Sequence, residues 1–191
     1  MSEHSLNGQP GGPASPWVRR FAPLIPAGEA LDLACGDGRH ARHLAGLGHP
    51  VLALDRDAAA LARAAGPGIT TLQADLEAAD AAWPFSPGRF SGIVVTNYLH
   101  RPLVADIVGS LAPHGVLLYE TFSLGNEIFG KPSNPDFLLA PGELLDWAHR
   151  CGLTVVAFED GRLDTPKAAM VQRLCAVKAD FPRISTLLPA F

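Results

Sequence analysis

The chain has 191 residues, which is enough for one sizeable α/β core and too short for two full domains. Apolar residues make up 48% and charged residues 18% of it, a balance typical of a globular enzyme and not of a disordered chain. The formal net charge is −4, without a cluster of Lys and Arg, which argues against nucleic acid as a partner because phosphate binding needs clustered cations.

The first 14 residues are rich in Gly, Pro and Ser and carry few apolar side chains. Such a segment cannot bury enough surface to offset the entropy lost on ordering, so we predict a disordered tail over residues 1–14 and a single domain over residues 15–191. A helix is predicted over residues 17–24, because Ser15 is a favoured cap and Pro16 a favoured first residue.

From residue 30 onward, apolar strand-like stretches alternate with helical ones. This alternation indicates a parallel sheet covered by helices on both faces. Residues 76–88 are predicted to be irregular. Strands are predicted over residues 30–33, 51–54, 69–74, 90–96 and 116–120, and helices over residues 39–47, 57–65 and 102–111.

The pattern changes after the fifth strand. Residues 122–141 form a predicted loop of about 20 residues, and loops of that length in a compact domain are usually functional lids or disordered. Its large apolar side chains favour a lid or ordered insert over disorder; they are Phe129, Phe137, Leu138 and Leu139.

The C-terminal part is predicted to end in two paired strands. A helix over residues 141–150 stops at a glycine, and strands over residues 154–158 and 170–178 follow. The polar connection between them, residues 159–167, is short and suits an antiparallel pair.

The most informative segment is Leu31-Asp32-Leu33-Ala34-Cys35-Gly36-Asp37-Gly38-Arg39-His40. Here a strand leads into a glycine turn that opens a helix, so that Gly36 and Gly38 permit a sharp turn and the free N–H groups of the helix can face a ligand. The spacing Gly36-x-Gly38-x-x-Ala41 also fits the dinucleotide fingerprint. Asp32 favours a different ligand, because a carboxylate within a strand needs a partner that an ammonium group would provide and a pyrophosphate would not.

Five segments, in this order along the chain, resemble the class I methyltransferases that use S-adenosylmethionine. The segment LDLACGDG matches their first motif, and VLALD, LQADL, FSGIVVTN and LAPHGVLL resemble the next four, with His114 in place of a glycine in the last. They cover residues 30–121. The resemblance implies a Rossmann-like α/β fold, with a mostly parallel seven-stranded sheet in the order 3-2-1-4-5-7-6, the last strand antiparallel, and helices on both faces.

The resemblance also implies S-adenosylmethionine as the cofactor. Asp55, at the end of the second strand, would accept hydrogen bonds from the ribose hydroxyls, and Asp75, at the end of the third, would contact the adenine amino group. Asp75 is alternatively an ordinary turn residue, and Arg39 either faces the ligand's carboxylate or is exposed. The predicted cofactor-binding residues are Asp32, Ala34, Gly36, Gly38, Arg39, Asp55, Arg56, Asp75, Leu76 and Asn97.

The segments NYLHRP and YETF, after the fourth strand and at the end of the fifth, look like a signature of small tellurite-resistance-like methyltransferases, which does not make tellurite the substrate. Because ligands of open α/β sheets bind beyond the carboxyl ends of the strands, we predict the catalytic residues there. His100 is the first choice as general base and Glu120 the second; Arg101 would instead orient an anionic acceptor, and Tyr98 completes the set.

No metal site is predicted. His40 and His43 lie three residues apart on one predicted helix, but a third ligand with suitable spacing is missing. We interpret both as part of a solvated or half-buried helix face.

The location of the protein is predicted from what the sequence lacks. No apolar run approaches the ~20 residues that span a bilayer, and the N-terminus lacks the basic, apolar and small-residue regions of a secretory signal. The three cysteines, Cys35, Cys151 and Cys175, have no CxxC spacing, which favours reduced thiols. We therefore expect a cytoplasmic protein without a membrane partner; the oligomeric state is not predicted.

The predicted function is methyl transfer from S-adenosylmethionine to a small-molecule acceptor. An NAD-dependent oxidoreductase is one alternative, on the strength of the dinucleotide spacing. A non-catalytic module that binds the nucleoside is the other.

Overall fold

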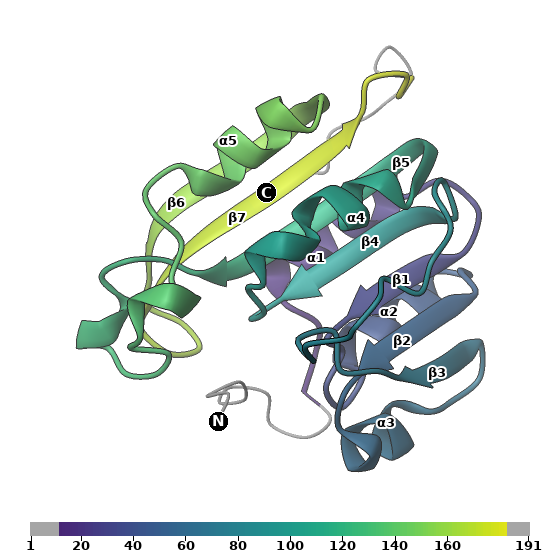
Figure 1. Ribbon diagram of the computed structural model, residues 1–191, viewed down its shortest axis with the longest axis horizontal. Coiled ribbons are helices and arrows are strands. Elements are labelled where there is room, and N and C mark those ends of the chain that lie inside the picture. Colours follow the sequence, from purple (N-terminus) through teal and green to yellow (C-terminus); the bar gives the residue numbers. More distant parts are fainter. Residues whose placement is uncertain (1–11, 183–191) are drawn as a thin grey trace.

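The structure is a computed structural model that describes residues 12–182 (Figure 1). The predicted tail falls for the most part on residues 1–11, outside the described range, and at its end Ala14 is buried. Helix α1 (Pro16–Phe21) begins at Ser15, whose side chain accepts a backbone hydrogen bond from the first turn, as its cap position predicts. A 3-10 turn, η1 (Ala22–Leu24), completes the predicted helix.

Seven strands form one sheet in the order β3-β2-β1-β4-β5-β7-β6, which confirms the predicted topology. Strands β1 to β5 are all parallel to one another, and β7 runs antiparallel to both β5 and β6. The strands are β1 (Ala30–Leu33), β2 (Val51–Asp55), β3 (Ile69–Gln73), β4 (Phe90–Thr96), β5 (Leu111–Phe122), β6 (Leu153–Leu163) and β7 (Ala169–Lys178).

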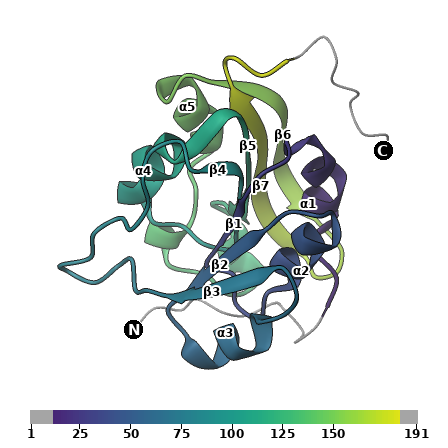
Figure 2. The same cartoon turned by 90° about the vertical axis from the view of Figure 1, so that its right-hand side faces the viewer.

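Helices cover both faces of the sheet, as predicted (Figure 2). On β4, Val94 packs into the core on one face, whereas Ile93 and Val95 pack into the core on the other, because successive side chains of a strand point to opposite sides. Among the residues described, no helix is both long and apolar enough to cross a membrane. One face carries α1, α2 (Arg39–Gly46) and α3 (Ala58–Ala64), and the other carries α4 (Val104–Gly109) and α5 (Glu143–Arg150).

Two elements differ from the prediction because pairing across the sheet overrides the local pattern. β5 begins at Leu111, which pairs with Phe90 of β4, so the helix predicted over residues 102–111 ends earlier. The structure has the 3-10 turn η2 (Arg101–Leu103) followed by α4 in its place. β6 runs on to Leu163, through most of the polar stretch predicted as a connection. β6 is an edge strand, and its backbone bonds to β7 form whatever the polarity of the exposed side chains.

The insert, residues 122–141, lies beyond the carboxyl end of β5 (Figure 1). It contains two 3-10 turns, η3 (Asn126–Ile128) and η4 (Pro135–Phe137). Its ends are joined by a hydrogen bond from the Leu139 N–H to the Phe122 carbonyl, and the buried Asn126 bonds to the backbone of both the insert and β7. The insert is therefore an ordered part of the fold; its closure over a ligand stays a prediction.

Candidate active site

β1 leads into α2 through a tight turn in which Ala34, Gly36 and Gly38 have positive φ angles, of 55°, 52° and 76°. A Cβ atom placed on Gly36 would meet no atom within 4 Å, so the space in front of this residue is open. A Cβ atom placed on Gly38 would lie 2.6 Å from the Cβ of Ala64 in α3. Gly36 thus leaves room for a ligand, whereas Gly38 is needed for α3 to pack against the turn.

Asp32 is fully buried on β1, and only one of its two carboxylate oxygens has a hydrogen-bond partner among the described residues. Oδ2 accepts a hydrogen bond of 2.8 Å from the Ala41 N–H in the first turn of α2. Oδ1 is buried and has no hydrogen-bond partner among the described residues. Burial raises the pKa of Asp32 to about 7, against the opposing effects of the Ala41 N–H and the nearby Arg39. The site therefore suits a cationic partner for Oδ1.

Asp55 is held in place at the end of β2. Its Oδ2 accepts from the Gly36 N–H at 2.8 Å, and its Oδ1 accepts from the Asp57 N–H at 3.0 Å. A carboxylate offers about four lone-pair positions, so two remain for hydroxyl groups of a ligand. This geometry fits the ribose role predicted for Asp55.

Asp75 follows β3 and Tyr98 follows β4, and the charge of Asp75 acts on Tyr98. Asp75 Oδ1 accepts from the Glu77 N–H at 3.0 Å, which is the turn role that the sequence left open, and the adjacent Leu76 is buried. Burial, and then the Glu77 carboxylate beside it, raise the pKa of Tyr98. Tyr98, predicted at the acceptor site, thus lies beside the residues predicted to bind the adenine.

Three other predicted cofactor-binding residues lie around the same edge. Asn97 has a positive φ of 53° and donates its N–H to the Glu120 carbonyl at 2.8 Å, which fixes the backbone just after β4. Arg56 is exposed after β2. Arg39, half-buried at the start of α2, lowers the pKa of both the Asp32 and the Glu120 carboxyl groups, so its charge acts on both.

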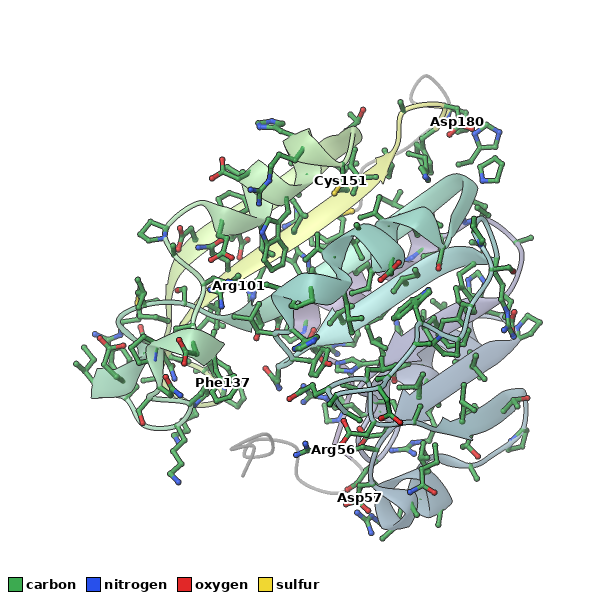
Figure 3. All side chains as sticks on the ribbon, in the orientation of Figure 1. Arg56, Asp57, Arg101, Phe137, Cys151 and Asp180 are labelled. Carbon is green, nitrogen blue, oxygen red and sulfur yellow. The ribbon has the colours of Figure 1, made fainter. Side chains whose placement is uncertain are left out.

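Arg101, predicted to orient the acceptor and labelled in Figure 3, forms hydrogen bonds to the insert and to α5. Its Nε lies 2.7 Å from Glu143 Oε1, and its Nη2 donates to Glu143 Oε2 at 3.0 Å. Nη1 donates to the Asp136 carbonyl at 2.7 Å and Nη2 to the Leu138 carbonyl at 2.9 Å. Four of the five N–H donors of a guanidinium are thus used, and in this arrangement Arg101 joins the insert to the segment after β4.

A row of polar side chains crosses four neighbouring strands near the carboxyl end of the parallel strands. Thr96 of β4 pairs with Glu120 of β5, Glu120 pairs with Arg173 of β7, and Arg173 pairs with Glu159 of β6. Residues that are paired across strands point to the same face, so these four side chains lie side by side. We call them the polar row.

Glu120 is the most buried acid of this row, with its side chain 10% exposed. Its Oε2 lies 3.2 Å from the Nε of Arg173 and accepts from the Ser15 hydroxyl at 3.3 Å. Burial raises the pKa of Glu120, and Arg173, Arg39 and the Ser15 hydroxyl oppose that rise. His100, the other predicted base, is half-buried at the start of η2, and no described hydrogen bond joins its side chain to the polar row.

His40 corrects the interpretation of a solvated or half-buried helix face. It is buried on α2, where its Nε2 accepts from the Ser15 N–H and its Nδ1 lies 3.3 Å from the Thr96 hydroxyl oxygen. Because Nε2 is an acceptor, the proton of the neutral ring is on Nδ1. Burial lowers the pKa of His40 to about 3. His43, in contrast, is half-buried, as expected.

Sequence reasoning missed three contributors to the site, namely Ser15, Thr96 and Arg173. Ser15 was identified as a helix cap, and nothing local indicates that its hydroxyl also reaches Glu120. Arg173 lies inside a predicted strand of mostly apolar residues, which is a usable signal, since a cation within a buried strand needs a partner.

Comparison with known proteins agrees with this geometry. A family described as a methyltransferase domain matches residues 30–115, which include the glycine turn and the first five strands as far as residue 115. The strand order is the one implied by the resemblance to class I methyltransferases. Residues 30–115 thus match a methyltransferase domain, and the described chain has the fold implied by the resemblance to class I methyltransferases.

Solved structures share the fold of this chain at low sequence identity. An S-adenosylmethionine-dependent methyltransferase from Mesorhizobium loti is 21% identical, with a TM-score of 0.67 over 85% of this chain and 96% of that one. A TehB-like methyltransferase from Corynebacterium glutamicum is 21% identical, with a TM-score of 0.61 over 84% and 86%. A geranyl diphosphate methyltransferase in complex with GPP and sinefungin is 15% identical, with a TM-score of 0.65 over 85% and 76%. No curated protein matches the sequence.

One departure of this chain from the class I methyltransferase motifs has a structural explanation. His114 stands where the fifth motif has a glycine, and it adopts a positive φ of 62°, which explains the usual glycine. Its backbone N–H donates to Asp180 Oδ1 at 3.0 Å, and its ring Nδ1 lies 2.6 Å from the Asp180 carbonyl oxygen. These contacts hold the turn at the end of the sheet opposite to the site.

Proposed function

We propose that this chain transfers the methyl group of S-adenosylmethionine to a small-molecule acceptor. The observation that carries the proposal is the buried Oδ1 of Asp32, unpartnered among the described residues, at the base of the open turn at Gly36. An unpaired buried carboxylate oxygen is costly, and the ammonium group of the cofactor would pair with it. The bound cofactor supplies a methyl group that is already activated by the sulfonium.

The proposed cofactor site follows from these contacts. Asp32 binds the ammonium group, Gly36 admits the ligand close to the backbone, and the free lone pairs of Asp55 accept the ribose hydroxyls. Asp75 and Leu76 lie at the adenine end. The full set is Asp32, Ala34, Gly36, Gly38, Arg39, Asp55, Arg56, Asp75, Leu76 and Asn97.

Catalysis in this proposal consists mainly of aligning the acceptor with the activated methyl group. Such positioning can supply roughly 7–11 kcal/mol of barrier reduction, and the insert would exclude water. Glu120 is preferred to His100 as a base, because burial raises its pKa and the charge of Arg39 acts on both Glu120 and Asp32. We propose no anchoring role for the Arg101 charge, which Glu143 already balances.

Calorimetric titration with S-adenosylhomocysteine tests the cofactor site. We expect the wild type to bind and both Gly36→Arg and Asp55→Ala to lose most of the affinity. Gly48→Arg is the matched control, because Gly48 also has a positive φ, of 95°, and open space for a side chain, but it lies just before β2 at the other end of the sheet. Wild-type affinity in Gly36→Arg would contradict the proposal.

Two measurements separate the alternatives. Protection from heat by NADH and not by S-adenosylhomocysteine would favour the oxidoreductase, against which the methyltransferase-domain match argues. Tight nucleoside binding without methyl transfer to any acceptor would favour a binding module. We also propose a cytoplasmic location, which the three free thiols support because they suit a reducing compartment.

A further inference from the structure

We infer that the acceptor is a neutral molecule that presents an N–H or O–H group to Glu120, and that small anions are excluded from this site. The inference rests on the proposed methyl transfer and deepens it by naming the substrate class. It follows from how the charged side chains around Glu120 are already paired.

The positive charge of Arg173 is balanced within the chain. Its Nε lies 3.2 Å from Glu120 Oε2, its Nη1 lies 3.2 Å from Glu159 Oε2, and its guanidinium lies 5.9 Å from the centre of the Trp17 ring. Arg173 is therefore placed between two carboxylates and under an aromatic ring. An incoming anion would have to displace one of these carboxylates.

The charges of Arg101 and Arg39 also act on carboxylates of the chain. Arg101 forms a two-pronged ion pair with Glu143 and binds two carbonyl groups of the insert. Arg39 acts on the carboxylates of both Asp32 and Glu120. Arg56 follows β2, on the far side of β1 and β4 from Glu120 in the strand order.

His40 adds no positive charge. Its Nε2 accepts the Ser15 N–H, so the ring is neutral, and burial keeps it neutral down to a pKa of about 3. An anionic acceptor would thus meet the negative Glu120, and the charges of Arg173 and Arg39 already act on carboxylates of the chain. Close like charges in a poorly solvated site repel strongly.

One carboxylate oxygen of Glu120 contacts other side chains, and the other has no hydrogen bond among the described residues. Both described contacts are made by Oε2, to Arg173 and to the Ser15 hydroxyl. The Ser15 hydroxyl can point its proton at Glu120 because its own lone pair accepts the Val18 N–H. Arg173 and Ser15 are therefore positioning residues, and Oε1 is left to accept an N–H or O–H from the acceptor.

The reaction balances with Glu120 as the base. The acceptor's nitrogen or oxygen forms a bond to the methyl carbon while its proton moves to Oε1 of Glu120. The bond between the methyl carbon and sulfur breaks, and its electron pair stays on sulfur, which gives S-adenosylhomocysteine. The negative charge of Glu120 and the positive charge of the sulfonium both disappear, and a neutral acceptor becomes a neutral methylated product.

Selenite titrated into the complex with S-adenosylhomocysteine tests the exclusion of anions without turnover. We expect no binding to the wild type and at least a tenfold gain in Glu120→Gln or Glu143→Gln, because each change leaves an arginine with less negative charge beside it. Glu29→Gln is the matched control: it releases Arg89 from an equivalent two-pronged pair at the opposite end of the sheet. Binding to the wild type, or no greater gain in either site variant than in the control, would overturn the inference.

Methyl transfer from labelled S-adenosylmethionine tests the substrate class. We expect label on N–H or O–H probes such as imidazole or catechol, reduced about 10²–10⁴-fold in Glu120→Gln, and none on selenite or tellurite. Label on either oxyanion overturns the inference, as does equal transfer by Glu120→Gln. Failure of the wild type to bind S-adenosylhomocysteine, measured first, would instead count against the proposed function.

Discussion

Asp32, His40 and Glu120 are buried near the carboxyl end of the sheet, and each has a different set of partners. His40 is kept neutral, with both ring nitrogens within hydrogen-bonding distance of a partner. Glu120 is balanced by Arg173, whereas Asp32 keeps one buried oxygen without a partner among the described residues. Buried charges are costly unless paired, so the incomplete pairing of Asp32 is the residue-scale sign of a ligand site.

We expect the affinity for S-adenosylhomocysteine to depend on pH through Asp32. Its pKa is raised to about 7 in the free protein, so below that pH the carboxyl must lose a proton before it can pair with the ligand's ammonium group. Affinity should therefore fall as the pH drops from 7.5 to 5.5, by at most about tenfold per unit. Calorimetry in buffers of different ionisation enthalpy would detect the released proton.

Asp32→Asn supplies the comparison for this pH dependence. It should bind more weakly at pH 7.5, with an affinity that changes little between the two pH values. Equal wild-type affinity at pH 5.5 and pH 7.5 would show that Asp32 does not titrate with binding.

At the scale of elements, two contacts define the walls of the site. α3 packs closely against the glycine turn because Gly38 has no side chain. A Cβ atom placed on Gly38 would also lie 2.8 Å from the Cα of Ala64 in α3. On the other side, Arg101 joins the insert and α5 to the segment after β4. Both contacts are structural, and both involve residues that the sequence suggested for ligands.

Gly38→Ala should destabilise the protein more than Gly36→Ala. Both changes place a side chain at a positive φ, which costs roughly 1–2 kcal/mol. Only the change at Gly38 adds a clash with backbone atoms of α3, at roughly 1–3 kcal/mol more. Urea unfolding of the two variants would measure the difference, with Gly48→Ala as a control for the positive φ; equal free energies of unfolding would contradict the packing role.

Arg101→Lys should loosen the insert without unfolding the domain. A lysine cannot reach Glu143 and the carbonyls of Asp136 and Leu138 together, because it lacks the planar fork of donors. We expect roughly fivefold faster hydrogen exchange of backbone amides at residues 136–140, as the pair is partly exposed. Arg89→Lys, which disrupts the pair with Glu29, should leave this exchange unchanged; unaltered exchange in Arg101→Lys would remove Arg101 as the anchor.

At the scale of the whole molecule, the site is assembled from distant parts of the chain. Ser15, His40, Thr96, Glu120 and Arg173 belong to five different segments, and all meet at the carboxyl end of the sheet. The doubly covered sheet places the ends of its parallel strands at one edge, and open α/β sheets bind ligands there. A ligand that contacts several of these segments should therefore stabilise the whole domain.

S-adenosylhomocysteine should raise the melting temperature, whereas NADH should not. At a ligand concentration of 100 times Kd the stabilisation is about 2.7 kcal/mol, which corresponds to roughly 5–10 °C for a chain of this size. A thermal melt with each ligand, repeated with Asp55→Ala, measures it. An equal rise in Asp55→Ala would place the ligand elsewhere.

The sequence by itself determined the succession of strands and helices along the chain, the glycine turn and the positions of Asp32 and Asp55. These features are local: a strand, a turn and a helix start follow each other within a few residues, and periodicity and glycine spacing record them directly. The resemblance of five ordered segments to one superfamily then determined the topology. The positive φ of Ala34, Gly36 and Gly38 follows from the same local turn.

Only the tertiary structure decided which partners the charged residues take. The pairing of β5 with β7, about 50 residues later in the chain, sets Arg173 beside Glu120, and no local pattern records that register. The same holds for the burial of His40 beneath Ser15 and for the binding of Arg101 to Glu143. Backbone pairing also extended β6 through residues whose polarity suggested a loop. Side-chain periodicity records which face a residue takes, but its partner depends on strands and helices that only the fold brings together.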